Sequence, residues 1–197
     1  MVEEERWVSL AQKGDKEAFC QLIRAYQAPV YNLAYRMLGD PDEAEDATQE
    51  TFLRAFSRLH TYDPGYKFSS WILSIASHYC LDQLRKRKGR FVSLEGIKSW
   101  RWMPDRRPQP EERFLQHEEQ VAVRRILSKL PPQYRVVVIL RYWYGYSYEE
   151  MARMLETSQS AIKSRLHRAR KMMAKLLQVS EETQVSKESR DALPASL

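Results

Sequence analysis

The sequence predicts an all-α protein with two small helical domains joined by an extended linker, the C-terminal domain being a helix-turn-helix. Only 6 of its 197 residues are glycine, while leucine, alanine, arginine and glutamate are abundant, a composition that favours helices. Apolar residues recur every three or four positions over residues 7–84 and 111–179, which is the period of amphipathic helices. Residues 91–110 lack that period and contain three prolines, so they are expected to form the linker. The polar residues 180–197 are expected to form a disordered tail.

The first domain is expected over residues 1–90, with a helix whose apolar positions recur over residues 22–37. Gly39 interrupts that series. Asp40 is well placed to cap a second helix, which has proline at its first position and an apolar face over residues 41–55. The sequence therefore predicts a sharp reversal between two packed helices.

A turn is expected next at Tyr62–Gly65, because its aspartate, proline and glycine all favour turns. Apolar residues then recur over residues 71–79 and continue a third helix into a run of basic residues. His78, Asp82 and Arg85 follow one another at intervals of four and three, so they share one polar face of this helix.

The second domain is expected over residues 111–179. Within it, the run at residues 136–140 contains β-branched side chains that suit a strand. Pro131 and Pro132 suit the start of a helix, however, and Gly145 marks its end, so the intervening length favours a buried helix.

A helix-turn-helix is expected at the end of this domain. A short helix covers residues 148–155, and Ser160 is expected to cap a second helix after a break at residues 156–159. Apolar residues from Ile162 to Met173 lie on one side of the second helix. Its other side carries the candidate DNA-binding residues Lys163, Ser164, His167 and Arg168. This pattern is typical of a helix that enters the major groove, although a helical hairpin with a basic solvent face is the alternative.

Charge is segregated along the chain, whose formal net charge is +6. Residues 40–50 contain six acidic residues and no lysine or arginine, whereas residues 160–175 contain six lysines and arginines and no acid. A second basic run covers residues 85–90. The net charge favours an anionic partner, and the segregation indicates at least two kinds of partner surface. Solvated helix faces are the alternative explanation of such runs.

The sequence argues against several classes of site. Cys20 and Cys80 have no metal-ligand spacing and are expected to be buried free thiols. The four histidines are scattered, so no catalytic residues, metal site or cofactor are expected. The N-terminus has no signal-peptide pattern, and the longest aliphatic run is far shorter than the roughly 20 residues that span a bilayer. A cytoplasmic protein without membrane insertion is therefore expected.

A second nucleic-acid site is expected in the loop that precedes Trp71. Its candidate residues are Tyr66, Lys67, Phe68 and Ser69. Aromatic rings next to a lysine suit the stacking of unpaired bases while phosphate is neutralised. A base removed from a duplex needs such a pocket to offset its lost stacking. The polar helix face of His78, Asp82 and Arg85 extends this site, and the alternative is that Phe68 and Trp71 belong to the core.

These segments together resemble a bacterial RNA polymerase sigma factor of the extracytoplasmic-function group, over roughly residues 8–178. The resemblance depends on six segments in order: residues 35–40, 43–56, 68–76, 130–131, 148–152 and 162–170. Their order and spacing are much more specific than any one segment alone.

The resemblance implies a protein that binds RNA polymerase core, directs it to specific promoters and supports promoter melting. In the family, the acidic helix docks on a coiled coil of the largest polymerase subunit, which points to Asp46, Gln49 and Glu50. The minus-ten element would be recognised by Tyr66, Lys67, Phe68, Ser69, His78, Asp82 and Arg85. The minus-thirty-five element would be recognised by Lys163, Ser164, His167 and Arg168. Further implied partners are promoter DNA, the flap of the second-largest subunit and an anti-sigma factor.

Two other functions remain open at this stage. A transcriptional regulator that uses only the helix-turn-helix would not bind polymerase core tightly, and it leaves the acidic residues 40–56 unexplained. A metal-dependent nuclease could use Asp42, Glu43, Glu45 and Asp46, although no lysine or histidine accompanies these acids. Cleavage of DNA with magnesium in the absence of polymerase would identify such a nuclease.

Overall fold

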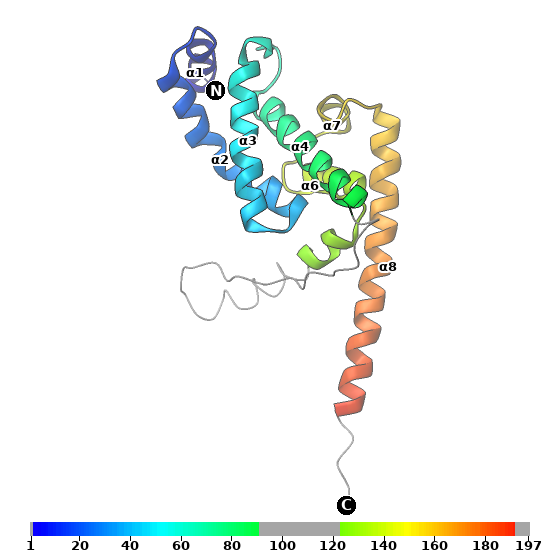
Figure 1. The fold of residues 1–197 in the computed structure, drawn as a ribbon. Coiled ribbons are helices and arrows are strands. Elements are labelled where there is room, and N and C mark those ends of the chain that lie inside the picture. The colour runs from blue at the N-terminus through cyan, green and yellow to red at the C-terminus, as the bar shows by residue number, and fades with distance from the viewer. Residues whose placement is uncertain (1, 91–122, 192–197) are drawn as a thin grey trace, which may run out of the picture.

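The computed structural model of the chain describes residues 2–90 and 123–191, which contain helices and no strand. The predicted linker at residues 91–110 lies outside the described residues. The elements of the N-terminal domain are α1 (Val2–Gln12), α2 (Lys16–Leu38), α3 (Pro41–Arg58), the 3-10 helix η1 (Leu59–Thr61) and α4 (Phe68–Arg90) (Figure 1). In the described part of the chain, no helix has the length and apolar content needed to cross a membrane.

The boundary between α2 and α3 forms as the sequence predicts. Gly39 adopts the left-handed conformation, with a φ of 84°, and its N–H donates to the Tyr35 carbonyl at the end of α2. The Asp40 carboxylate accepts a hydrogen bond from the Glu43 N–H at 3.0 Å, and Pro41 occupies the first position of α3. The chain therefore reverses sharply, and α3 packs back against α2.

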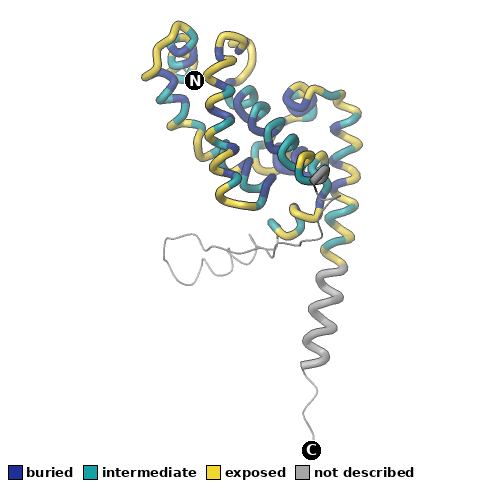
Figure 2. Tube along the Cα trace, viewed as in Figure 1, coloured by how far each residue is buried: buried dark blue, intermediate teal, exposed yellow. Residues whose placement is uncertain are grey.

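The core of the N-terminal domain lies between α2, α3 and α4, whose inward faces are dark blue in Figure 2. Leu22 and Leu33 of α2, Ala44 and Ala47 of α3, and Ile72 of α4 are completely buried there. Burial of one large aliphatic side chain contributes roughly 1.5–3 kcal/mol. This packing holds the outer face of α3 and the start of α4 in defined positions.

The C-terminal domain contains a helical segment at residues 123–129 and three further helices. These are α6 (Pro132–Tyr142), α7 (Tyr148–Met154) and α8 (Gln159–Asp191). Residues 136–140 are helical and completely buried, which confirms the predicted buried helix and shows that the strand alternative is wrong. Gly145 has a φ of 70° and lies in the turn after α6, as expected.

The expected cap of α8 is wrong. The cap is Ser158, whose hydroxyl accepts a hydrogen bond from the Ala161 N–H at 3.2 Å, whereas Ser160 lies inside the helix. At its other end α8 continues to Asp191. Residues 180–191 contain no glycine or proline that would end a helix.

The two domains contact each other, since α6 and α7 pack against α2 and α4 (Figure 1). Arg135 is buried at this junction and donates hydrogen bonds to the carbonyls of Met37, Ser128 and Leu130. Burial lowers the pKa of Arg135 to about 10, so its guanidinium remains charged at neutral pH. Because the Met37 carbonyl lies at the C-terminal end of α2, a positive charge is favourable there.

Candidate functional site

The first candidate surface is the outer face of α3, which carries the predicted acidic residues. Asp46 and Gln49 are exposed and Glu50 is partly buried. The Glu50 carboxylate accepts a hydrogen bond from Arg54 Nε at 2.7 Å, and the Arg54 guanidinium lies 4.9 Å from the Tyr79 ring centroid. These contacts hold Glu50 in place, while Asp46 and Gln49 present their side chains to solvent.

A groove of about 640 Å³ runs beside this acidic face, between α2 and α3. It is lined by Ile23, Gln27, Ala28, Tyr31, Glu45, Thr48, Gln49 and Phe52. Two large apolar side chains of α3 are also exposed, Leu53 by 66% and Phe56 by 51%. Sequence analysis did not predict that these two apolar side chains are exposed. The signal was that neither residue occupies one of the positions expected to form the buried face of α3. Apolar groups beside acidic ones are typical of protein-binding surfaces.

The second candidate surface is the loop at residues 62–67, between η1 and α4. The Asp63 carboxylate accepts a hydrogen bond from the Gly65 N–H at 2.8 Å, and the Asp63 carbonyl accepts one from the Tyr66 N–H at 3.1 Å. The Tyr62 hydroxyl donates to the Tyr66 carbonyl. This tight turn leaves Tyr66 50% exposed and Lys67 exposed, with the Lys67 ammonium 3.2 Å from the Glu150 carboxylate. Ser69, in the first turn of α4, is partly buried.

Phe68 lies in the core and not on this exposed surface. Its side chain is only 1% exposed. The rings of Tyr26, Tyr62 and Trp71 surround it, with centroids 5.3, 5.5 and 5.5 Å away. Phe68 therefore anchors the start of α4 in the core and supports the loop from beneath. Sequence analysis left open the alternative that Phe68 belongs to the core, and the structure places it there.

The polar face of α4 extends the second surface. The side chains of His78 and Asp82 are partly buried and that of Arg85 is exposed. The His78 Nδ1 lies 2.9 Å from the Ser74 carbonyl, so Nδ1 carries a proton and Nε2 points away from its own helix turn. Arg85 forms an ion pair with Asp82 at 2.8 Å, which orients the guanidinium along the helix.

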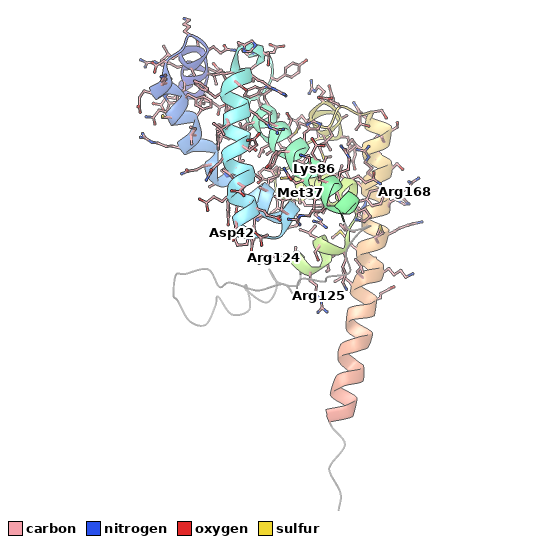
Figure 3. The ribbon with its side chains drawn as sticks, viewed as in Figure 1. Met37, Asp42, Lys86, Arg124, Arg125 and Arg168 are labelled. Carbon is pink, nitrogen blue, oxygen red and sulfur yellow. The ribbon has the colours of Figure 1, made fainter. Side chains whose placement is uncertain are left out.

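The third candidate surface is the exposed side of α8. Ile162, Leu166 and Ala169 are buried against the rest of the domain, as predicted. The predicted residues on the opposite side are all exposed: Lys163, Ser164, His167 and Arg168. The neighbouring Arg168 guanidinium, labelled in Figure 3, lowers the pKa of the Tyr134 hydroxyl of α6. This contact ties the basic side of α8 to the helix behind it.

The start of α7 has a capping box that sequence analysis missed. The Ser147 hydroxyl accepts a hydrogen bond from the Glu150 N–H at 3.1 Å, and the Glu150 carboxylate accepts one from the Ser147 N–H at 2.8 Å. The signal was the spacing of serine and glutamate by three positions. This reciprocal pair fixes the position at which α7 begins.

Comparisons with known proteins identify this arrangement. The chain matches the family model described as Sigma-70 region 2 over residues 22–90, and the one described as Sigma-70, region 4 over residues 120–173. It is 32% identical over 176 residues to the ECF RNA polymerase sigma factor SigW of Bacillus subtilis, covering 86% of this chain and 94% of that protein. The chain belongs to the extracytoplasmic-function (ECF) sigma factors. This ECF sigma factor therefore binds RNA polymerase and directs it to promoters, where transcription is initiated.

Other relatives agree with this assignment. The ECF sigma factor SigE of Mycolicibacterium smegmatis is 35% identical over 154 residues, covering 78% of this chain and 59% of that protein. Among solved structures, CnrH in complex with the cytosolic domain of CnrY has a TM-score of 0.67 at 24% identity, covering 90% of this chain and 98% of that one. That structure supports the all-helical fold with two domains.

Proposed function

We propose that the three surfaces divide the work of this sigma factor, with core binding and minus-ten recognition in residues 1–90 and minus-thirty-five recognition in residues 111–179. The single observation that carries this division is that the acidic, the aromatic and the basic side chains are exposed on three separate elements. These elements are α3, the loop at residues 62–67 with α4, and α8. Each surface has the chemistry of a different partner.

The face of α3 would dock on a basic coiled coil of the largest polymerase subunit. Asp46, Gln49 and Glu50 supply its polar contacts. The hydrogen bond that Arg54 donates to the Glu50 carboxylate keeps this carboxylate in one orientation. The exposed Leu53 and Phe56 supply apolar area, which an interface made of acids alone would lack. The flap of the second-largest subunit would contact the C-terminal domain.

The loop at residues 62–67, which we now call the minus-ten loop, would capture an unpaired base of the minus-ten element. The exposed ring of Tyr66 can stack on a base while Lys67 neutralises an adjacent phosphate. Ser69, His78, Asp82 and Arg85 would form the rest of this site. Phe68 contributes only as the buried support of the loop.

The exposed side of α8 would lie in the major groove at the minus-thirty-five element. Lys163 and Arg168 carry the charges that recognise guanine edges, and Ser164 and His167 lie between them on the same exposed side. The neighbouring Tyr134 hydroxyl would limit the orientations of the Arg168 guanidinium.

We further propose that the protein acts in the cytoplasm, where polymerase and promoter DNA are found, and that it catalyses no reaction itself. An anti-sigma factor is the proposed regulator, because the structural neighbour RpoE of Bartonella quintana was crystallised with the anti-sigma factor NepR. Binding of this chain to a purified anti-sigma factor from the same genome, measured by calorimetry, tests that proposal. Failure of all such candidates to bind would contradict it.

Run-off transcription with purified core polymerase on a pool of promoters tests the main proposal. A promoter-dependent transcript is expected, and its absence from an active core preparation would refute the assignment. Asp46→Ala should weaken core binding, with Glu17→Ala on the distant end of α2 as the matched control. Arg168→Ala should alter the choice of minus-thirty-five sequence, and Arg125→Ala in the exposed helical segment at residues 123–129 is its control.

The same assay separates the alternatives. A regulator that uses only the helix-turn-helix would bind duplex DNA without core and would give no transcript. A nuclease would cleave DNA with magnesium alone. Within residues 2–90 and 123–191, no three histidine, cysteine, aspartate or glutamate side chains are placed to hold a metal ion.

A further inference from the structure

The first helix, α1, contacts the segment from which the minus-ten loop begins. The side-chain amide nitrogen of Gln12, the last residue of α1, donates hydrogen bonds to the Leu59 and Tyr62 carbonyls, each at 3.0 Å. Leu59 is the first residue of η1 and Tyr62 follows its last residue. Figure 1 shows α1 beside the end of α3 at which η1 follows. Gln12 therefore joins the start of the chain to the start of the minus-ten loop.

Local sequence features fix the position of Gln12. Gly14 has a φ of 96°, and its N–H donates to the Ala11 carbonyl at 3.0 Å. The Asp15 N–H donates to the Leu10 carbonyl at 3.1 Å, and the Asp15 side chain caps α2. The first two hydrogen bonds form the Schellman motif, which ends a helix at a residue in the left-handed conformation. As a result α1 ends at a defined residue and packs against both α2 and η1.

The glutamine amide matches the two groups that it contacts. Carbonyl oxygens only accept hydrogen bonds, and the amide nitrogen of Gln12 has two N–H groups, one for each carbonyl. Gln12 is partly buried, and Leu59 and Tyr62 are only 3% and 8% exposed, so water competes little for these bonds. A carboxylate at position 12 would have no donor and would face two carbonyl oxygens. The site therefore selects an amide over an acid of the same shape.

Tyr62 transmits this restraint to Tyr66. The Tyr62 ring packs against the rings of Phe68 and Trp71, and its hydroxyl donates to the Tyr66 carbonyl. Burial and nearby carboxylates raise the pKa of Tyr62, so its hydroxyl remains a donor at neutral pH. Gln12 thus holds the backbone of Tyr62, and the Tyr62 side chain holds the backbone of Tyr66.

These hydrogen bonds belong to the N-terminal domain alone. The Tyr66 ring also lies 5.1 Å from the Arg153 guanidinium of α7, whereas the partners of Gln12 and Tyr62 all lie within residues 2–90. Gln12 precedes residues 22–90, which match the Sigma-70 region 2 model. The match therefore assigns no role to this residue.

We propose that Gln12 is a positioning residue for base capture, because it holds the start of the minus-ten loop in the conformation that presents the Tyr66 ring. It acts through Tyr62 and makes no contact with DNA itself. A loop that is already ordered loses less conformational entropy when it binds a strand, so its affinity for the strand is higher. The proposal rests on the proposed capture of an unpaired base by the minus-ten loop.

Binding of single strands to holoenzyme tests the role of Gln12. The probes are the fluorophore-labelled non-template strand of a minus-ten element, from a promoter found by run-off transcription, and copies with an abasic site at each position in turn. The abasic site that most weakens wild-type binding identifies the captured base. Gln12→Glu has nearly the same shape without a donor at neutral pH. It should weaken binding of the intact strand about tenfold and leave binding of that abasic strand unchanged.

Gln21→Glu is the matched control. It makes the same change of charge at a glutamine whose amide donates to the Glu17 carboxylate of its own helix, α2. Both affinities should therefore stay as in the wild-type holoenzyme. Equal losses of affinity of Gln12→Glu for the intact and the abasic strand would show a merely structural role of Gln12 and would overturn the proposal. An unchanged affinity for both strands would overturn it as well.

A second variant tests the path through Tyr62. Tyr62→Phe keeps the ring and removes the hydroxyl that holds Tyr66, so it should also weaken binding of the intact strand alone. Because both residues act on the same backbone, the double variant Q12E/Y62F should lose no more affinity than the weaker of the two single variants. Additive losses would overturn the proposed path.

Tyr66→Ala separates the failure of the two proposals. If Tyr66→Ala keeps the wild-type preference for the intact strand, the proposed base capture by the minus-ten loop fails. If Tyr66→Ala abolishes that preference and Gln12→Glu retains it, base capture stands and the role of Gln12 is refuted.

Discussion

Phe68 and Tyr66 lie two positions apart, and their burial predicts opposite consequences of substitution. Phe68 is 1% exposed, whereas Tyr66 is 50% exposed. Phe68→Leu keeps an apolar side chain but removes the ring contacts to Tyr26, Tyr62 and Trp71. Each contact contributes roughly 0.5–1.5 kcal/mol, and leucine packing replaces part of the loss. The expected destabilisation is therefore about 2 kcal/mol.

That loss corresponds to a decrease of on the order of 10 °C in the melting temperature of a domain of this size, which still leaves a folded protein at 25 °C. Tyr66→Ala should change the melting temperature by less than about 3 °C, because the ring is half exposed. It should instead reduce promoter opening. The measurements are thermal denaturation followed by circular dichroism, and permanganate detection of unpaired thymines in the holoenzyme at 25 °C.

A decrease in promoter opening by Phe68→Leu at 25 °C, with an unchanged melting temperature, would refute the reasoning. Phe68 would then be a stacking residue despite its burial. The reasoning would also fail if Tyr66→Ala destabilised the fold and had no effect on promoter opening.

Three further predictions concern the C-terminal domain and the cysteines. Arg168→Ala should cost about 1–3 kcal/mol on promoters that differ in the minus-thirty-five element, whereas a uniform loss on all promoters would make Arg168 a phosphate contact. The hydrogen bonds of the Ser147 capping box lower the pKa of Glu150, so its stabilising contribution is present above its ordinary pKa and is lost as the pH falls through the lowered value. Thermal melts below about pH 4 should therefore show a smaller difference between wild type and Glu150→Gln than melts at pH 7. Burial raises the pKa of the Cys80 thiol to about 12, so native alkylation at pH 8 should modify the half-buried Cys20 first, and labelling of Cys80 should require denaturant.

Much of the fold follows from local sequence features. The end of α2 at Gly39 and the start of α3 at Asp40 depend on one backbone conformation and one side-chain cap, both encoded within a few residues. The helical character of residues 136–140 follows from their length and the flanking proline and glycine. The exposed side of α8 follows from helical periodicity alone, which is why its four candidate residues were predicted together.

Other features depended on neighbours that periodicity does not identify. An aromatic residue at a helix start can lie in the core or at the surface, and the rings of Tyr26, Tyr62 and Trp71 decide that Phe68 is buried. Ser158 and Ser160 both lie near the start of α8, and either hydroxyl has the chemistry to cap the helix. The position of the first helical turn, set by the packing of α8, selects Ser158 over Ser160.

By itself, the sequence determined that the chain has two helical domains, an acidic helix and a basic C-terminal helix, because helix periodicity, caps and charge runs are local properties. Only the tertiary structure decided that Lys67 meets Glu150 and that Arg153 covers Tyr66. Those contacts join residues more than 80 positions apart, and they exist because α6 and α7 pack on α2 and α4. The outer face of α3 makes no such contact, whereas the loop at residues 62–67 touches α7, because only one side of the N-terminal domain receives that packing.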